Sequence, residues 1–179
     1  SLNCPLYKIS SFEMTDFPLI KKVAKTGKPL IISTGMAQLD EITETYNFAK
    51  KNGANEIALL YCVSNYPAKD EDFNLKNISI LKNKFKCTVG FSDHSKNNNV
   101  AKTAISLGAH IVEKHIALEN QKKGPDIDFS LKGKKIKKFR NDIDKIYQIL
   151  GKNKFVRKKS ENKSLLHRRS IYVIKNIKK

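Results

Sequence analysis

The chain has 179 residues, of which 40% are apolar, so it is long enough and apolar enough to bury one sizeable core. No apolar run approaches the roughly 20 residues that span a bilayer, and the start of the chain has no signal-peptide pattern. Three scattered cysteines argue against a disulfide framework, so we expect a cytoplasmic protein that does not enter a membrane.

Five β-α units are predicted along the chain. In order, apolar runs favour strands at 7–11, 29–33, 57–62, 88–91 and 110–112. Helical spacing of apolar residues follows each strand, at 19–24, 39–49, 75–81, 100–105 and 136–150. Asp16 is placed to cap the first of these helices, and Pro18 lies in its first turn. This alternation predicts a parallel α/β sheet with helical crossovers.

Polar residues recur where each predicted strand ends. They are Ser11 and Glu13, Ser33, Ser64 and Tyr66, Ser92 and His94, and Glu113 and His115. This repetition is the pattern expected at the catalytic rim of a (β/α) barrel. A doubly wound open sheet is the alternative, although the chain has no G-x-G-x-x-G or P-loop motif. Five units cannot close an eight-stranded barrel, so we expect an open sheet or a piece of a longer protein.

Two histidines follow neighbouring strands, in the clusters Ser92-Asp93-His94 and Glu113-Lys114-His115. If the strands are adjacent and parallel, their backbones are about 4.8 Å apart. His94 and His115 are therefore candidates for a two-histidine metal site, and ordinary surface or hydrogen-bonded histidines are the competing interpretation.

The formal net charge is +18, and much of the excess lies toward the C-terminal end. These lysines and arginines have no interleaved aromatic residues suited to base stacking. We therefore favour a solvated basic surface over a nucleic-acid-binding module. After a basic, loop-like segment at 151–167, the run 169–174 is predicted to form one lone strand.

Seven motifs, in order along nearly the whole chain, resemble the sialic acid synthases, the bacterial nonulosonate synthase family. They are Y-K-I-S-S-F-E, P-L-I-I-S-T-G-M, C-V-S-N-Y-P, G-F-S-D-H-S, I-V-E-K-H, G-P-D and R-R-S-I-Y, between Tyr7 and Tyr172. The resemblance implies a (β/α)8 TIM-barrel fold followed by a small antifreeze-like domain, working as a homodimer. Residues 1–150 would be the C-terminal part of the barrel, 151–167 a linker, and 168–179 the first strand of the further domain.

The resemblance also implies an activity: metal-assisted condensation of phosphoenolpyruvate with an N-acetylated amino sugar such as N-acetylmannosamine, releasing phosphate. Metal ligands of the family match His94 and His115, with Mn²⁺ foremost and Co²⁺, Mg²⁺ or Zn²⁺ as alternatives. Its remaining site positions match, for phosphoenolpyruvate, Lys8, Ser11, Ser33 and Ser92; for catalysis, Glu13 and Glu113; and for the sugar, Ser64, Tyr66 and Asp126.

The chain departs from the family pattern in two ways. Sialic acid synthases often have C-T-N-x-Y-P where this chain has Cys62-Val63-Ser64-Asn65-Tyr66-Pro67, so the sugar, including a legionaminate or pseudaminate precursor, stays open. The motifs of the family's first three strands are missing, so we expect little activity from these 179 residues alone. A different metal-dependent barrel, such as an aldolase or a phospho-sugar synthase, is the competing enzyme class.

Overall fold

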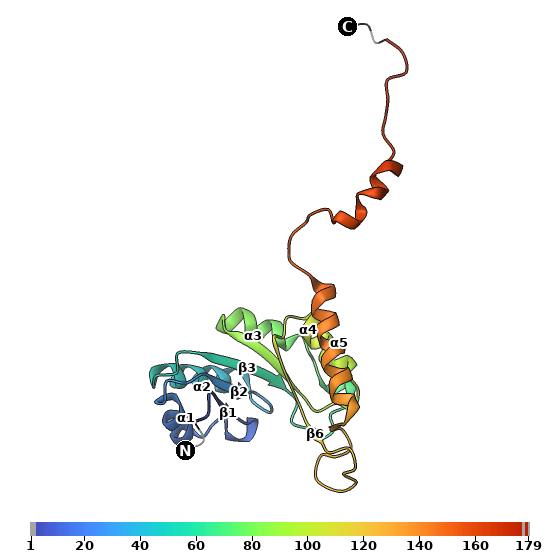
Figure 1. The fold of residues 1–179 in the computed structure, drawn as a ribbon. Helices are drawn as coiled ribbons and strands as arrows, with labels where there is room; N and C mark the ends of the chain where they lie inside the picture. Colours follow the sequence, from blue (N-terminus) through green and yellow to red (C-terminus); the bar gives the residue numbers. More distant parts are fainter. Residues whose placement is uncertain (1–2, 177, 179) are drawn as a thin grey trace.

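The computed structural model describes residues 3–176 and 178 and is built on one five-stranded parallel sheet (Figure 1). Its strands lie side by side in chain order, β1-β2-β3-β4-β5. They are β1 (Tyr7–Ile9), β2 (Leu30–Ser33), β3 (Ile57–Cys62), β4 (Thr88–Asp93) and β5 (Ile111–Lys114). All four neighbouring pairs are parallel, as predicted, and this order is that of a partial (β/α) barrel.

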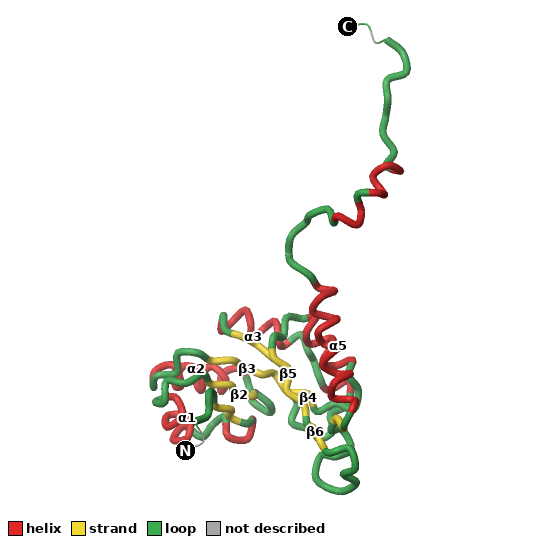
Figure 2. The backbone as a smooth tube through the Cα atoms, viewed as in Figure 1, coloured by secondary structure: helices red, strands yellow, loops and turns green. Residues whose placement is uncertain are grey.

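A helix follows every strand. The helices are α1 (Phe17–Ala24), α2 (Leu39–Lys51), α3 (Asn77–Phe85), α4 (Asn99–Ser106) and α5 (Lys134–Leu150). The Asp16 carboxylate accepts a hydrogen bond from the Leu19 amide at 3.0 Å, which confirms the predicted cap. Figure 2 shows the helices arranged around the outside of the strands.

The alternation of side chains along each strand separates an outer from an inner face. Leu30, Ile32, Leu59, Val89 and Phe91 are at most 1% exposed and belong to the hydrophobic core shared with the helices. The intervening residues point to the inner face of the sheet. Because the strands are in register, the inner positions of neighbouring strands lie side by side, as at Cys62 and Ser92.

The sheet curls strongly enough for its first and last strands to meet. The Lys8 ammonium, on β1, lies 3.2 Å from the Glu113 carboxylate, on β5, although three strands separate them in the sheet. The contact crosses the inner face. The structure is therefore a half-barrel rather than the flat open sheet that was the alternative.

Strand ends differ from the predicted boundaries in ways that matter for the site. β1 stops at Ile9, and 11–13 form a turn of 3₁₀ helix instead of strand and loop. β4 continues to Asp93, so Ser92 is part of the strand. Two short strands were not predicted: β6 (Ile116–Ala117) and β7 (Leu131–Lys132) pair in parallel directly beyond β5.

The segment after α5 extends away from the half-barrel (Figure 1). The prediction of a strand over 169–174 is wrong, because the structure has no strand there. The apolar side chains of this run are 72–102% exposed: Ile171, Tyr172, Val173 and Ile174. A segment with the composition of a strand forms a strand only when its backbone can hydrogen-bond to another strand beside it. The assignment of 168–179 to an antifreeze-like domain, and the boundaries at 150 and 167, stay predictions.

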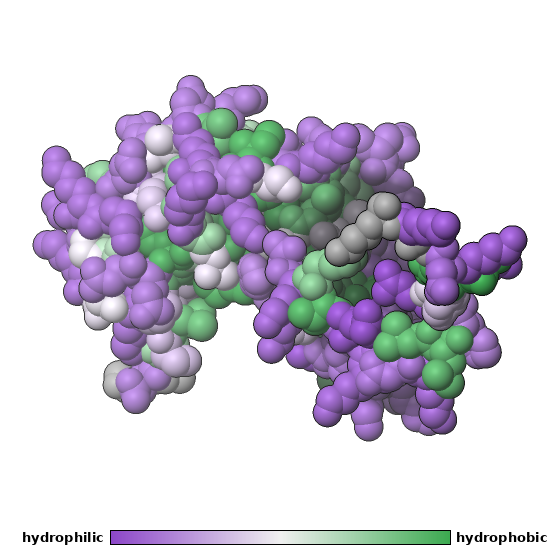
Figure 3. Space-filling model, turned by 90° about the horizontal axis from the view of Figure 1, so that it is seen from above, coloured by the Kyte–Doolittle hydropathy of each residue, from purple (hydrophilic) through white to green (hydrophobic). Residues whose placement is uncertain are grey.

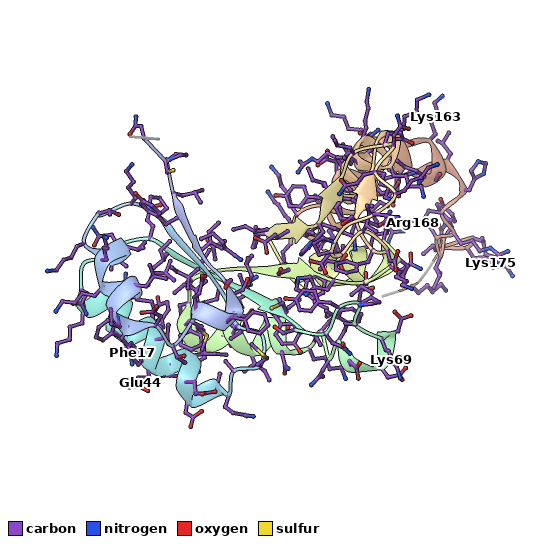
Figure 4. The ribbon with its side chains drawn as sticks, turned by 90° about the horizontal axis from the view of Figure 1, so that it is seen from below. Phe17, Glu44, Lys69, Lys163, Arg168 and Lys175 are labelled. Carbon is purple, nitrogen blue, oxygen red and sulfur yellow. The ribbon has the colours of Figure 1, made fainter. Side chains whose placement is uncertain are left out.

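Hydrophilic side chains cover most of the face shown in Figure 3. In Figure 4, Lys163, Arg168 and Lys175 all lie on the C-terminal segment, away from Phe17 and Glu44, which mark α1 and α2. Every residue from 151 to 176 is exposed.

Within the described ranges, no helix has the length and apolar character needed to cross a membrane.

Candidate active site at the carboxyl ends of the strands

A hydrogen-bonded triad of Lys8, Ser92 and Glu113 lies on the inner face of the half-barrel. Ser92 and Glu113 are opposite each other in the β4–β5 register, and the serine hydroxyl donates to the carboxylate at 2.7 Å. The same carboxylate oxygen accepts from Lys8 at 3.2 Å. Three residues predicted from separate strands therefore converge. Glu113 holds the ammonium in a place where a carboxylate or phosphate could bind it by charge-assisted hydrogen bonds.

A second cluster forms where β2 and β3 end. The Ser11 hydroxyl accepts from the Gly35 amide at 3.0 Å and lies 3.0 Å from the Cys62 thiol. A Cβ on Gly35 would lie 2.2 Å from the Ser64 hydroxyl, so Ser64 belongs to this cluster as well. Only glycine leaves room for this close approach.

Ser33, at the end of β2, is 3% exposed, and its hydroxyl has no hydrogen-bond partner among the residues that the structure describes. A buried hydroxyl without a partner is costly, so it is a candidate to bind a ligand. It comes two residues before Gly35 on the same strand end. The serines predicted to bind phosphoenolpyruvate thus lie at neighbouring strand ends. Cys62 lies among them, although it was not predicted.

His94 and His115 come together as predicted, with ring centroids 5.4 Å apart. The Nδ1 atom of His94 lies 2.9 Å from the Val63 carbonyl oxygen, which can only accept. Nδ1 therefore carries the proton and donates it, leaving the Nε2 lone pair free. Burial lowers the pKa of the His94 imidazole below its ordinary value, and the neighbouring His115 lowers it further. His94 is consequently neutral at pH 7, as a metal ligand must be.

Asp126 is the third group of this end of the site. Its carboxylate lies 3.6 Å from Nδ1 of His115, which is longer than a hydrogen bond. No group of three or more histidine, cysteine or acidic side chains surrounds a metal position within residues 3–176 and 178. The two imidazoles of His94 and His115 lie close together at this end of the site, and imidazole nitrogen is a common ligand of divalent transition-metal ions.

An aromatic wall encloses the two histidines. The Tyr66 ring lies 4.3 Å from the His94 ring, and the buried Phe129 ring lies 5.1 Å from the His115 ring. Burial raises the pKa of the Tyr66 phenol. A hollow of about 320 Å³ adjoins Tyr66, Asp126 and Phe129. This volume suits a small polar ligand such as a monosaccharide.

Glu13 forms its hydrogen bonds with Ser10, which is not among the predicted site residues. Its carboxylate accepts from the hydroxyl and the amide of Ser10, at 2.8 and 3.1 Å, and the side chain is exposed. Hydrogen bonds from Ser10 lower the pKa of the Glu13 carboxyl, and the charge of Lys8 lowers it further. Glu13 is therefore ionised at neutral pH and able to accept a proton or a hydrogen bond.

Besides Cys62, two further features of the site were not predicted. Asp93 and Lys114 form a buried ion pair of 2.8 Å behind the histidines, although both stand inside the clusters that drew attention to His94 and His115. Phe129 follows the G-P-D motif by three residues. Alternation along the strands places Asp93 and Lys114 on the outer face, one residue from an inner position, but only the register brings them opposite each other. Nothing in the sequence brings Phe129 to His115.

Comparisons with known proteins identify the family and support the fold. The model of the NeuB family matches residues 1–155. An N,N'-diacetyllegionaminic acid synthase of Campylobacter jejuni is 40% identical over 181 residues, which cover 99% of this chain and 54% of that protein. A pseudaminic acid synthase of Helicobacter pylori is 38% identical over 180 residues, covering 100% of this chain and 53% of that protein.

Among solved structures, an N-acetylneuraminic acid synthetase of Leptospira borgpetersenii, in complex with citrate, aligns with a TM-score of 0.85. It is 32% identical, and the alignment covers 92% of this chain and 57% of that one. The chain thus spans about half the length of the relatives that it matches.

Proposed function

Because the chain belongs to the NeuB family of nonulosonate synthases, which act in carbohydrate biosynthesis, we propose that its strand-end site condenses phosphoenolpyruvate with an N-acetylated amino sugar. The observation that carries the proposal is the convergence of Lys8, Ser92, Glu113, His94 and His115 at one end of the half-barrel. In this reaction the enol carbon bonds to the aldehyde carbon of the sugar, water adds to the phosphate-bearing carbon, and phosphate leaves.

Each group has a role that its surroundings support. Lys8 and the hydroxyls of Ser11, Ser33 and Ser92 bind the carboxylate and phosphate of phosphoenolpyruvate. Glu113 aligns Lys8 and Ser92 through the contacts described above. An ionised Glu13 positions or deprotonates the attacking water.

The histidine end of the site receives the sugar. Tyr66 and Asp126 border the hollow and would contact the sugar there, and Ser64, in the cluster with Ser11 and Gly35, is a further sugar contact. His94 and His115 would hold a divalent ion, Mn²⁺ foremost, which when bound polarises the aldehyde oxygen as a Lewis acid. The identities of 40% and 38% to synthases named for different sugars differ too little to choose between their substrates.

Ligand binding to the 179-residue chain tests the proposal directly. Phosphoenolpyruvate should bind in calorimetry, and Lys8→Met should abolish the signal whereas Lys21→Met, on the exposed face of α1, should not. Bound Mn²⁺ should lose its free-ion electron paramagnetic resonance signal, and His115→Ala should restore that signal. His110→Ala is the matched control, because His110 precedes the same strand at its other, exposed end. If His110→Ala and His115→Ala bind Mn²⁺ alike, the site is misassigned.

The reaction itself is tested by phosphate release from phosphoenolpyruvate with N-acetylmannosamine and with di-N-acetylated hexosamines. We expect the 179-residue chain to turn over slowly, since it spans about half the length of its relatives and we propose that the active site is completed in a homodimer. Supplying the remaining half of a relative as a second polypeptide should raise the rate. Phosphate release that needs no amino sugar would contradict a condensation.

A further inference from the structure

A buried ion pair stands directly behind the two histidines. Asp93 and Lys114 are opposite each other in the β4–β5 register, and the ammonium lies 2.8 Å from the carboxylate. Their side chains are 0% and 3% exposed. Each residue immediately precedes a histidine, so the pair joins the two strands at the last step before His94 and His115.

The pair also anchors the backbone beyond His94. The second oxygen of Asp93 accepts from the Ser95 amide at 2.8 Å, and the Lys114 ammonium donates to the Ser95 carbonyl at 2.6 Å. His94 is thus held between two fixed residues, 93 and 95, and both are tied to β5 through one lysine. The buried charges are paired and hydrogen-bonded, which is the condition for tolerating them.

Stability alone does not call for charges at this place. Asp93 continues the outer face of β4 after Val89 and Phe91, both 0% exposed, so an apolar side chain would extend the core pattern. Replacing a buried ion pair by apolar residues is often neutral or stabilising. What an apolar pair cannot do is fix the two strand ends in one register through directional hydrogen bonds to Ser95.

We propose that Asp93 and Lys114 are positioning residues, which set the separation and orientation of the His94 and His115 rings and thereby the affinity for a divalent ion. The inference deepens the proposed function and rests on it for the identity of the metal. The position of the rings, however, can be measured without any metal.

The main test replaces the pair by apolar residues, Asp93→Leu with Lys114→Met, in the 179-residue chain. Circular dichroism checks folding, Mn²⁺ titration by electron paramagnetic resonance gives the affinity, and nuclear Overhauser effects between the His94 and His115 ring protons report their separation. We expect a folded protein that binds Mn²⁺ about 10- to 100-fold more weakly, the range typical for lost outer contacts of metal ligands. The inter-ring Overhauser effect should weaken or vanish.

Two further variants keep the test decisive. Phe91→Leu, on the same outer face, should lower the melting temperature through lost packing but leave the Mn²⁺ affinity and the Overhauser effect unchanged. If the apolar pair does not fold, Asp93→Asn retains the acceptor for Ser95 and removes the charge, and should weaken Mn²⁺ binding to a smaller degree.

The outcomes separate the inference from the proposed function. Wild-type protein that binds no Mn²⁺ would refute the metal site, yet an Overhauser effect lost only in the Asp93 and Lys114 variants would still support positioning. A folded apolar-pair variant with the wild-type Overhauser effect and affinity would overturn the inference. So would Phe91→Leu if it lost affinity to the same extent, because general destabilisation would then explain the result.

Discussion

The backbones of β4 and β5 approach closely at Gly90, and Gly90→Ala is the sharpest test of how the site is built. A Cβ at this position would lie 2.5 Å from the Ile111 carbonyl oxygen and 2.5 Å from a methyl carbon of Leu60. Real Cβ atoms essentially never approach other atoms within 3.0 Å, so the Ile111 backbone must retreat by at least about 0.5 Å. Because Gly90 and Ile111 are opposite in register, the displacement would separate the two strands.

The expected loss of stability follows from overpacking. Inserting a methyl group into a packed interior costs about 1–3 kcal/mol. For a chain of this size that lowers the melting temperature by about 2–12 °C. Gly90 is not in the left-handed region, so alanine brings no backbone strain and would by itself stabilise by about 0.4–1 kcal/mol through the unfolded state. A loss therefore measures the clash.

Thermal unfolding followed by circular dichroism measures the effect, and phosphoenolpyruvate calorimetry reports the site. Ser92 and Glu113 are two positions further along the same strands, so their 2.7 Å hydrogen bond should stretch and phosphoenolpyruvate binding should weaken. Gly35→Ala is the comparison for thermal unfolding only, because there the nearest atoms are the side-chain tips of Ser64, Cys62 and Ser11, which shift at lower cost than backbone does. A Gly90→Ala protein that melts at or above the wild-type temperature would refute this account of the strand spacing.

Three further predictions concern single contacts. Lys8→Met should change the free energy of unfolding by only about 0–1 kcal/mol, since its ion pair is 29% and 42% exposed, and a larger change in chemical denaturation would mean that the pair is structural. Asp16→Ala should cost about 1 kcal/mol through the lost cap of α1, with faster hydrogen exchange at Leu19; unchanged exchange there would contradict the cap. Ser10→Ala should raise the pKa of Glu13 in a carboxyl NMR titration, because Ser10 holds that pKa down. A lowered folded pKa stabilises the protein above the usual carboxyl range, and this contribution disappears as the pH falls through the folded pKa, so the variant should lose less stability on acidification.

Much of the fold could be predicted because periodicity is strong where elements pack on a core. β3 was predicted at its observed bounds, and the five-unit order was correct. β6 and β7 have two residues each, too few for any period to show, so they escaped prediction. The run 169–174 has strand composition but no neighbouring strand in the structure, and composition alone does not make a strand.

The site could be predicted in outline because parallel strands end at one edge. That rule places His94 near His115, and Ser92 near Glu113, and both pairs meet. It does not predict that Lys8 reaches Glu113, since that contact depends on the curvature of the sheet. Nor does it reveal Asp93 and Lys114, whose partnership requires the residue-by-residue register.

The contact between Lys8 and Glu113 has a consequence for how the protein acquires function during folding. The two residues are 105 positions apart in the chain, so a long loop must close before they meet. Contacts of such long range form slowly compared with local helices. The triad consequently cannot exist in an intermediate that has ordered only some of the strands. Phosphoenolpyruvate binding would appear late in refolding, after helical circular dichroism, and would serve as a probe of the completed half-barrel.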